Sequence, residues 1–360
     1  MKRNYLAFPV ILFALLLMGA GCLTVGEKKD TTSGPAGVFV STNRGDAWKQ
    51  ISLLPEAQGV TSLTGVSVYR LFTDPQDAGT LYWSTRGNGL LYSYDDGGTW
   101  KKSVSPLDTG FIYSVAVHPE DKCVIYATNG RYVYKTEDCS RTWTEVYRET
   151  RANVLIVSLD INSFAPHQIY MALSNGDFFQ SVDLGQSWKI VRRFKARLEK
   201  IITDRHNNGN IFIATRSKGL VRSTDAGENW EDLGSALSEF SQGKDYRRFF
   251  AHPTEAGTLF WISQYGILVS NDSGSSWKAM NLLTAPGSVK IYGFAIDPQN
   301  SNNIYYTGTS GNRSTFYRTV DGGKNWITKK LPSGQLPTAI HVHPEKSDWV
   351  YVGFTIPPQS

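Results

Sequence analysis

The sequence predicts an all-β fold, a seven-bladed β-propeller whose blades each contain four strands. The main observation is an eight-residue motif that occurs seven times along the 360 residues. A second sequence marker recurs with the same period, between 42 and 52 residues. The composition agrees, because 33 glycines, 12% aromatic residues and only 19% charged residues favour short strands and tight turns over helices. Four short strands in each unit of 40–50 residues are typical of a propeller blade.

The repeated motif reads Ser/Thr-x-Asp-x-Gly-x-x-Trp. Its copies span residues 41–48, 93–100, 136–143, 181–188, 223–230, 270–277 and 319–326. Two copies deviate, because Asn43 replaces the Asp of the first and Ser140 replaces the Gly of the third. The motif is expected to form the turn between the third and fourth strands of each unit.

The second marker is a short apolar run that ends in Asp, His or Asn, after which apolar residues resume at a spacing of seven. The pairs are Asp74 and Leu81, His118 and Ile125, Asn162 and Ile169, Asp204 and Ile211, His252 and Leu259, Asp297 and Ile304, and His343 and Val350. This marker is expected to join the first two strands of each unit. In one unit the first three strands are thus predicted at 111–117, 124–128 and 132–135.

The two ends of the repeat region each supply half of a unit. Residues 339–342 and 350–354 read as a first and second strand, whereas residues 37–40 and those after Ala47 read as a third and fourth. We therefore expect the ends to pair and complete the seventh blade, which also removes exposed sheet edges.

These motifs resemble the Asp box of the BNR-repeat families, and we use the name Asp box below. The families include sialidases, sortilin-type receptors, xyloglucan-degrading glycoside hydrolases and photosystem II stability/assembly factors. The resemblance covers residues 37–354 and implies the propeller fold far more specifically than any one function.

The conserved chemistry of the Asp box predicts a structural role. The Asp is expected to accept hydrogen bonds from turn N–H groups, the Gly to supply a positive φ, and the Trp to pack between sheets. A Ca²⁺ site is the alternative, but one carboxylate per turn is a poor ligand set. The predicted structural residues are Asp95, Asp138, Asp183, Asp225, Asp272, Asp321, Trp48, Trp100, Trp143, Trp188, Trp230, Trp277 and Trp326.

The N-terminus is predicted to be an export signal. Lys2 and Arg3 precede an apolar run from Leu6 to Met18, which is too short to span a bilayer. Gly19-Ala20-Gly21 followed by Cys22 resembles a bacterial lipobox, although Gly19 stands where Leu is usual. We expect a signal peptide at 1–21, lipidation of Cys22, a flexible tether at 22–36 and a short tail at 355–360. Ordinary cleavage or an uncleaved anchor is the alternative.

Two cysteines of the same predicted blade are expected to meet. Cys123 opens the second strand and Cys139 follows the third, and these strands are antiparallel. Export permits a disulfide between them, with two free thiols as the alternative.

One group of loops is rich in basic residues. A propeller has two faces, and the loops between successive blades share one of them with the turns between second and third strands. On that face we predict a candidate ligand-binding set, for an acidic protein partner, a lipid head group or an anionic glycan, with solvated loop charge as the alternative. The set comprises Arg192, Arg193, Lys195, Arg197, Arg216 and Lys218.

No nucleophile-elbow, zinc-protease or phosphate-loop motif is present, and neither a metal nor another cofactor is predicted. The formal charge of +5 is too weak to indicate nucleic-acid binding. We expect a lipid-anchored scaffold on the periplasmic or cell-surface side of a bacterial membrane that binds a protein partner or membrane complex. Its architecture looks most like the photosystem II assembly-factor type. The alternative is a glycan-binding protein or glycosidase with paired acids among loop residues Asp108, Glu149, Asp177, Glu239 and Asp245.

Overall fold

The computed structural model describes residues 32–358. These residues belong to one compact unit of the chain, which begins at Thr32. The predicted signal peptide and Cys22 lie outside the described residues, as does most of the predicted tether. Within the described part, no helix has both the length and the apolar character needed to cross a membrane.

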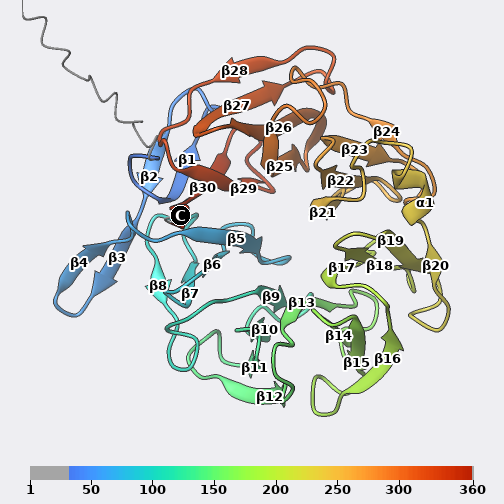
Figure 1. Ribbon diagram of the computed structural model, residues 1–360. Coiled ribbons are helices and arrows are strands. Elements are labelled where there is room, and N and C mark those ends of the chain that lie inside the picture. The colour runs from blue at the N-terminus through green and yellow to red at the C-terminus, as the bar shows by residue number, and fades with distance from the viewer. Residues whose placement is uncertain (1–31, 359–360) are drawn as a thin grey trace, which may run out of the picture. The chain divides into compact units, whose positions relative to one another are not determined.

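Seven four-stranded antiparallel sheets surround a central axis, which confirms the predicted propeller (Figure 1). We number the blades 1–7 and letter their strands A to D from the inside outward. Blade 1 contains β5 (Val68–Thr73), β6 (Leu81–Thr85), β7 (Leu90–Ser93) and β8 (Lys101–Lys102), and blade 2 contains β9 (Ser114–Val117), β10 (Ile125–Thr128), β11 (Tyr132–Thr136) and β12 (Thr144–Arg148). Blade 3 contains β13 (Ile156–Ile161), β14 (Ile169–Leu173), β15 (Asp177–Ser181) and β16 (Lys189–Arg193), and blade 4 contains β17 (Leu198–Thr203), β18 (Ile211–Thr215), β19 (Gly219–Ser223) and β20 (Glu231–Asp232). Blade 5 contains β21 (Tyr246–Ala251), β22 (Leu259–Ser263), β23 (Ile267–Ser270) and β24 (Lys278–Ala279), and blade 6 contains β25 (Lys290–Asp297), β26 (Asn300–Ser310), β27 (Arg313–Thr319) and β28 (Ile327–Lys329).

The two ends of the propeller together form blade 7, as the sequence predicts. Its strands, from A to D, are β29 (Leu336–Val342), β30 (Val350–Thr355), β1 (Gly37–Ser41) and β2 (Lys49–Ile51). Strand β1 pairs with β30 over five residues, from Gly37 opposite Phe354 to Ser41 opposite Val350. β29 begins three residues before the predicted strand, because a bulge between Pro337 and Ala339 lets its pairing with β30 continue.

The hydrophobic core lies between neighbouring blades. Side chains that alternate along each strand pack against the next sheet, so that Leu90 of blade 1 and Val115 of blade 2 share one cluster. The Asp-box tryptophan adds to this contact. The indole N–H of Trp100, for example, donates to the Ile51 carbonyl of the preceding blade at 3.0 Å. The indoles of Trp143, Trp188 and Trp326 also donate to the preceding blade, whereas those of Trp230 and Trp277 donate to a carbonyl of their own Asp box. Within residues 32–358, the indole N–H of Trp48 is buried without a partner.

Each Asp box is tied to the A–B turn of its own blade. The third residue after the Ser or Thr of the motif donates its N–H to a carbonyl of that turn. The donor and acceptor pairs are Arg44 and Asp348, Asp96 and Gly79, Cys139 and Cys123, Leu184 and His167, Ala226 and Gly209, Ser273 and Gly257, and Gly322 and Asn302. The A–B turns and the Asp boxes therefore lie on one face of the ring, and the D–A loops and B–C turns lie on the other.

Two successive residues of each Asp box adopt the left-handed backbone conformation. In blade 3 these are Leu184, with φ 60°, and Gly185, with φ 86°. The sequence indicates only the second, at the motif glycine, because the first occurs at a variable position. In blade 2 both positions are non-glycine, Cys139 and Ser140, so this turn carries the most backbone strain of the seven.

The Asp and Ser/Thr side chains hold these turns. In blade 3 the Ser181 hydroxyl donates to Asp183 and accepts from the Gly185 N–H, while Asp183 also accepts from the Ser187 N–H at 2.9 Å. Asn43 accepts the equivalent bond from Ala47 at 2.8 Å, so an amide can replace the carboxylate.

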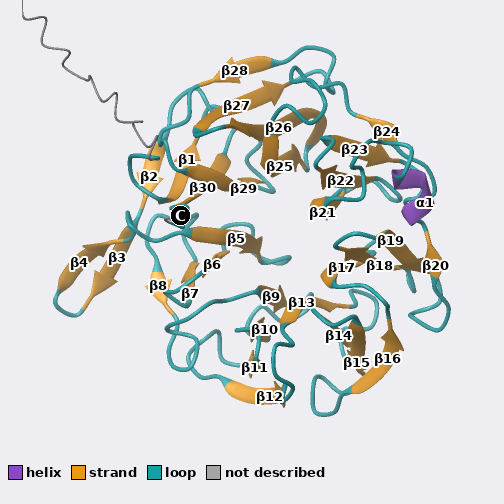
Figure 2. Ribbon diagram, viewed as in Figure 1, coloured by secondary structure: helices purple, strands orange, loops and turns teal. Residues whose placement is uncertain are grey.

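Three features depart from the predicted repeat. The D–A loop after blade 7 contains an exposed hairpin, β3 (Leu53–Glu56) and β4 (Gly59–Ser62), which projects from the ring (Figure 2). A short helix, α1 (Gly234–Leu237), occupies the loop after blade 4. Residues 32–36, which the sequence assigns to the tether, are held by hydrogen bonds to residues 333–335, including Ser333 Oγ to the Pro35 carbonyl at 2.7 Å.

The structure joins Cys123 and Cys139 by a disulfide. Cys123 lies in the A–B turn of blade 2 and Cys139 in its Asp box, with their Cα atoms 4.0 Å apart. The bridge therefore reinforces the hydrogen bond that ties these two turns in every blade, at the one box that lacks its glycine.

Removing this disulfide should destabilise the propeller. The paired replacement Cys123→Ser and Cys139→Ser is expected to lower the free energy of unfolding by about 3 kcal/mol, the value for a closed loop of about 15 residues. Chemical denaturation with and without reductant measures the effect. Reductant should destabilise the wild type and leave the paired variant unchanged, and equal sensitivity of the two would contradict the prediction.

Acid should weaken the Asp boxes. Hydrogen bonds from Thr142, Ser187 and the Asn325 N–H lower the pKa values of Asp138, Asp183 and Asp321 to about 2. A carboxylate whose pKa is lowered by folding stabilises the fold above its unfolded pKa of about 4. That contribution is lost as the pH falls from about 4 toward 2.

The triple variant Asp138→Asn, Asp183→Asn and Asp321→Asn tests this effect, with Asn43 as the natural precedent for the folded amide. Its melting temperature at pH 7 should stay near that of the wild type, and should fall less steeply between pH 4 and 2.5. Parallel pH profiles for the two proteins would refute the assignment.

Candidate functional site

The predicted basic residues gather on the face opposite the Asp boxes, in blades 3 and 4. Backbone hydrogen bonds join D–A loops to B–C turns there, from the Phe194 N–H to the Gly176 carbonyl and from the Arg216 N–H to the Arg197 carbonyl. The second bond places the loop of Arg197 against the turn of Arg216, while Arg192 and Arg193 form the end of strand β16. We call Arg192, Arg193, Lys195, Arg197, Arg216 and Lys218 the basic patch.

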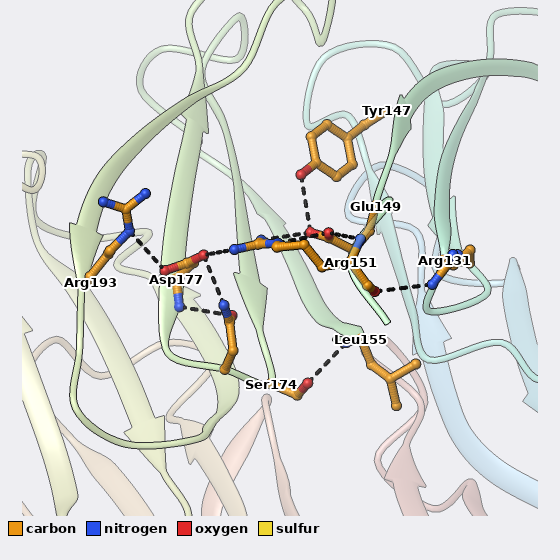
Figure 3. A network of polar contacts seen from close by, with 9 residues as sticks. Arg131, Tyr147, Glu149, Arg151, Leu155, Ser174, Asp177 and Arg193 are labelled. Carbon is orange, nitrogen blue, oxygen red and sulfur yellow. Dashed lines mark hydrogen bonds and ion pairs between the residues drawn. The ribbon is translucent and has the colours of Figure 1, made fainter. Parts of the chain in front are cut away.

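A network of buried carboxylates orients the arginines at one end of the basic patch (Figure 3). Arg151 binds Glu149 through Nε and Nη2 at 2.8 and 2.7 Å, and reaches Asp177 of blade 3 through Nη1 at 2.5 Å. Arg193 approaches the other oxygen of Asp177 at 3.4 Å. The Asp177 carboxylate also accepts a hydrogen bond from the side-chain amide of Asn175, so both of its oxygens have partners.

Burial and charge make this network a fixed arrangement. The side chains of Glu149 and Asp177 are only 2% and 4% exposed, whereas that of Arg193 is 71% exposed. The hydrogen bonds from Arg151 lower the pKa of Glu149 despite its burial, and those to both carboxylates raise the pKa of Arg151. Glu149 therefore stays ionised inside the protein while the Arg193 guanidinium faces solvent.

A second network lies in the neighbouring loop. Glu199 Oε1 accepts from Arg197 Nε at 3.0 Å and from Arg216 Nε at 2.7 Å. Glu199 is mostly covered, and Arg216 remains 65% exposed at its side chain. One carboxylate thus holds two guanidinium groups from different loops and leaves a net positive charge.

Three members of the basic patch are exposed and have no acidic partner among residues 32–358. They are Arg192, Lys195 and Lys218. With the two networks, the region contains seven basic side chains and three carboxylates, Glu149, Asp177 and Glu199, an excess of four positive charges.

The structure separates other basic residues of the same sequence segment from this site. Lys200 and Arg205 line the central channel, and Arg222 binds the Ser273 carbonyl near the Asp box of blade 5. They are close in sequence to the basic patch but lie on strand A, in an A–B turn and on strand C. The position of a residue along the blade decides which way its side chain points, so these three residues do not belong to the candidate site.

An aromatic cluster lies beside these loops on blades 1 and 2. Phe111 and Tyr113 stack with ring centroids 4.0 Å apart, and Tyr69 meets Phe111 edge-on at 4.7 Å. The exposed Arg86 covers Tyr69 and Phe111, with its guanidinium 5.8 and 5.9 Å from their ring centroids. No sequence motif marks this cluster, because its members come from different blades.

Two of the five candidate catalytic acids lie close together without forming an acid–base pair. Of the five predicted loop acids, the structure joins Glu149 and Asp177, but through one shared guanidinium. A general acid needs a pKa raised toward neutrality, whereas that of Glu149 is lowered. No group of three or more His, Cys, Asp or Glu side chains within the described range is arranged to hold a metal ion.

Similar proteins share the fold and differ in their named activities. A xyloglucanase from a Paenibacillus species is 24% identical over 265 residues, which are 66% of this chain and 23% of that enzyme. A GH74 xyloglucanase structure from Xanthomonas campestris superposes with a TM-score of 0.63 at 16% identity, covering 81% of this chain and 51% of the other. This chain therefore spans about a quarter of the Paenibacillus enzyme and half of the Xanthomonas one.

The structure of YCF48 bound to D1 peptide superposes with a TM-score of 0.60 at 14% identity, covering 90% of this chain and all of the other. The model of the Sortilin-Vps10 family, described as sortilin, neurotensin receptor 3, matches residues 265–355. The model of the photosynthesis system II assembly factor YCF48 matches residues 89–288, more than half of the chain. The chain therefore belongs to the family of the photosynthesis system II assembly factor YCF48.

Proposed function

We propose that this propeller is a non-catalytic scaffold that binds an anionic segment of a protein partner through the basic patch. The observation that carries the proposal is the charge arrangement of the site. Buried carboxylates fix Arg193, Arg197 and Arg216 in place, and three further cations beside them have no acidic partner. Guanidinium groups held in this way are preorganised for carboxylate ligands.

The likeness to a single-propeller protein bound to a peptide supports this class of partner. The YCF48 structure is covered over its whole length by this chain, whereas the xyloglucanases extend well beyond it. The aromatic cluster of Tyr69, Phe111 and Tyr113 adds an apolar surface next to the charged one. A peptide with both acidic and apolar side chains matches both surfaces.

Binding of xyloglucan or another glycan is the second candidate function. It is supported by the xyloglucanase relatives and by the half-buried aromatic cluster, since sugars stack on aromatic rings. Because Arg151 forms hydrogen bonds with both Glu149 and Asp177, this second candidate function favours glycan binding over glycan cleavage.

Charge reversal of the unpaired cations tests the partner proposal. The variant Arg192→Glu, Lys195→Glu and Lys218→Glu breaks no ion pair of the described chain, so the fold should be retained. Recovery of a specific partner by affinity capture from native membranes should fall about tenfold or more, because juxtaposed like charges cost several kcal/mol. The wild-type interaction should also weaken with added salt.

A matched variant carries the same charge change on the outer strands. Lys102→Glu, Lys189→Glu and Lys278→Glu alter exposed lysines of β8, β16 and β24 and should leave capture unchanged. A glycan array that includes xyloglucan oligosaccharides is run in parallel. Specific glycan binding without a captured protein would overturn the proposal, as would equal capture by the two variants.

We further propose that the propeller is exported and attached to a membrane through lipid on Cys22, as the sequence motif indicates. Replacement Cys22→Ser is expected to move the protein from the detergent phase to the aqueous phase in Triton X-114 partitioning, since acyl chains supply the anchor. Lipid labelling should be lost in the same variant. Retention of the variant in the detergent phase would refute lipidation at this residue.

A further inference from the structure

The central channel holds a cavity whose lining shares no residue with the basic patch. A cavity of about 560 Å³ is lined by the A strands and reaches the A–B turns at Pro75, Pro119 and Pro253. This volume is in the range of small-molecule sites. Its lining also includes Tyr246, Tyr292 and Thr338 near the start of their A strands, so the cavity runs along the channel.

The side chains of the channel follow one repeat position on each A strand. Four residues before the A–B turn residue, the blades carry Arg70, Ser114, Ser158, Lys200, Arg248, Gly293 and Ala339. The hydroxyl oxygens of the two serines accept hydrogen bonds from backbone N–H groups of the next blade, Ser114 from Leu159 and Ser158 from Ile201, at 3.1 Å each. The three cations instead line the cavity.

These three cations converge without a matching set of acids. Arg248 reaches from blade 5 to the Thr338 carbonyl of blade 7 at 3.4 Å. Burial lowers the pKa of Arg248 and that of Lys200, the latter to about 8, and the charge of Arg70 lowers both. Asp160 is the one A-strand carboxylate in the lining, and it is already bound by the N–H and hydroxyl of Thr203.

Hydrogen-bond donors in the cavity wall remain unused. Nη1 of Arg70 is buried with no hydrogen-bond partner, and Lys200 has neither an ion pair nor a hydrogen bond through its ammonium among the described residues. Buried polar groups are nearly always paired, so unused donors with excess positive charge point to an acceptor ligand.

The next level of the channel, nearer the A–B turns, is mainly apolar. Two residues further along each A strand, the blades carry Phe72, Ala116, Asp160, Ile202, Phe250, Ala295 and His341, all of which line the cavity except Ala295. The cavity therefore combines a cationic level with a mainly apolar level nearer the A–B turns.

We propose that the central channel binds a small organic anion, with its phosphate or carboxylate between Arg70, Lys200 and Arg248 and its apolar part against Phe72, Ile202 and Phe250. The oxyanion would neutralise the clustered cations and supply acceptors to their free donors. Its apolar part would cover the hydrophobic side chains that line the level nearer the A–B turns.

Calorimetric titration with inorganic phosphate and with phenyl phosphate, at constant ionic strength maintained with chloride, tests the proposal. Both should bind the full chain, and phenyl phosphate should bind more tightly because its ring reaches the apolar level. Lys200→Met should weaken both by about tenfold, the effect of one charge-assisted hydrogen bond. Lys200→Arg should retain binding, and the surface control Lys102→Met should match the wild type.

Thermal unfolding distinguishes loss of the site from loss of the fold. Without ligand, Lys200→Met should melt at or above the wild-type temperature, because one of three repelling charges is gone, but phosphate should stabilise it less. Arg70→Met provides an independent variant with the same expectation. Absence of binding by both probes to the wild type, or unchanged affinity in Lys200→Met and Arg70→Met, would overturn the proposal.

Discussion

The pairing of β1 with β30 is the constraint on which the rest of the architecture depends. It joins the two ends of the propeller through five residue pairs, so that every blade packs between two neighbouring blades. Each blade buries its apolar faces against the next, so a ring closed in this way supports every intersheet cluster. Closure also fixes seven A strands around one channel and sends all D–A loops to the same face.

Within that ring, the Asp box and the A–B turn act as one structural unit in each blade. The hydrogen bond between them recurs in all seven blades, and blade 2 adds the Cys123–Cys139 disulfide at the same contact. One face of the ring therefore consists of turns with nearly the same geometry, and each Asp box on it has two residues in the left-handed conformation. The opposite face is free to vary, and it carries the hairpin β3–β4, helix α1 and the basic patch.

The two proposed sites use positive charge in different ways. On the D–A face, buried carboxylates such as Asp177 hold guanidinium groups whose outer edges meet solvent, which suits a large anionic surface. In the channel, Arg70, Lys200 and Arg248 share a desolvated space with few acceptors, which suits a small ligand. The two proposals thus assign a macromolecular partner to the D–A face and a small anion to the channel.

The sequence by itself determined the blade count, the strand order and the closure by the two ends, and it predicted a structural role for the Asp box and the meeting of Cys123 with Cys139. Each of these follows from a local pattern repeated at a fixed period. Only the tertiary structure decided which cations are paired. Arg151 and Asp177 are 26 residues apart, Arg216 and Glu199 are 17 apart, and the channel cations come from blades 1, 4 and 5. Such contacts depend on side-chain direction and on neighbours across blades, and no local spacing encodes either.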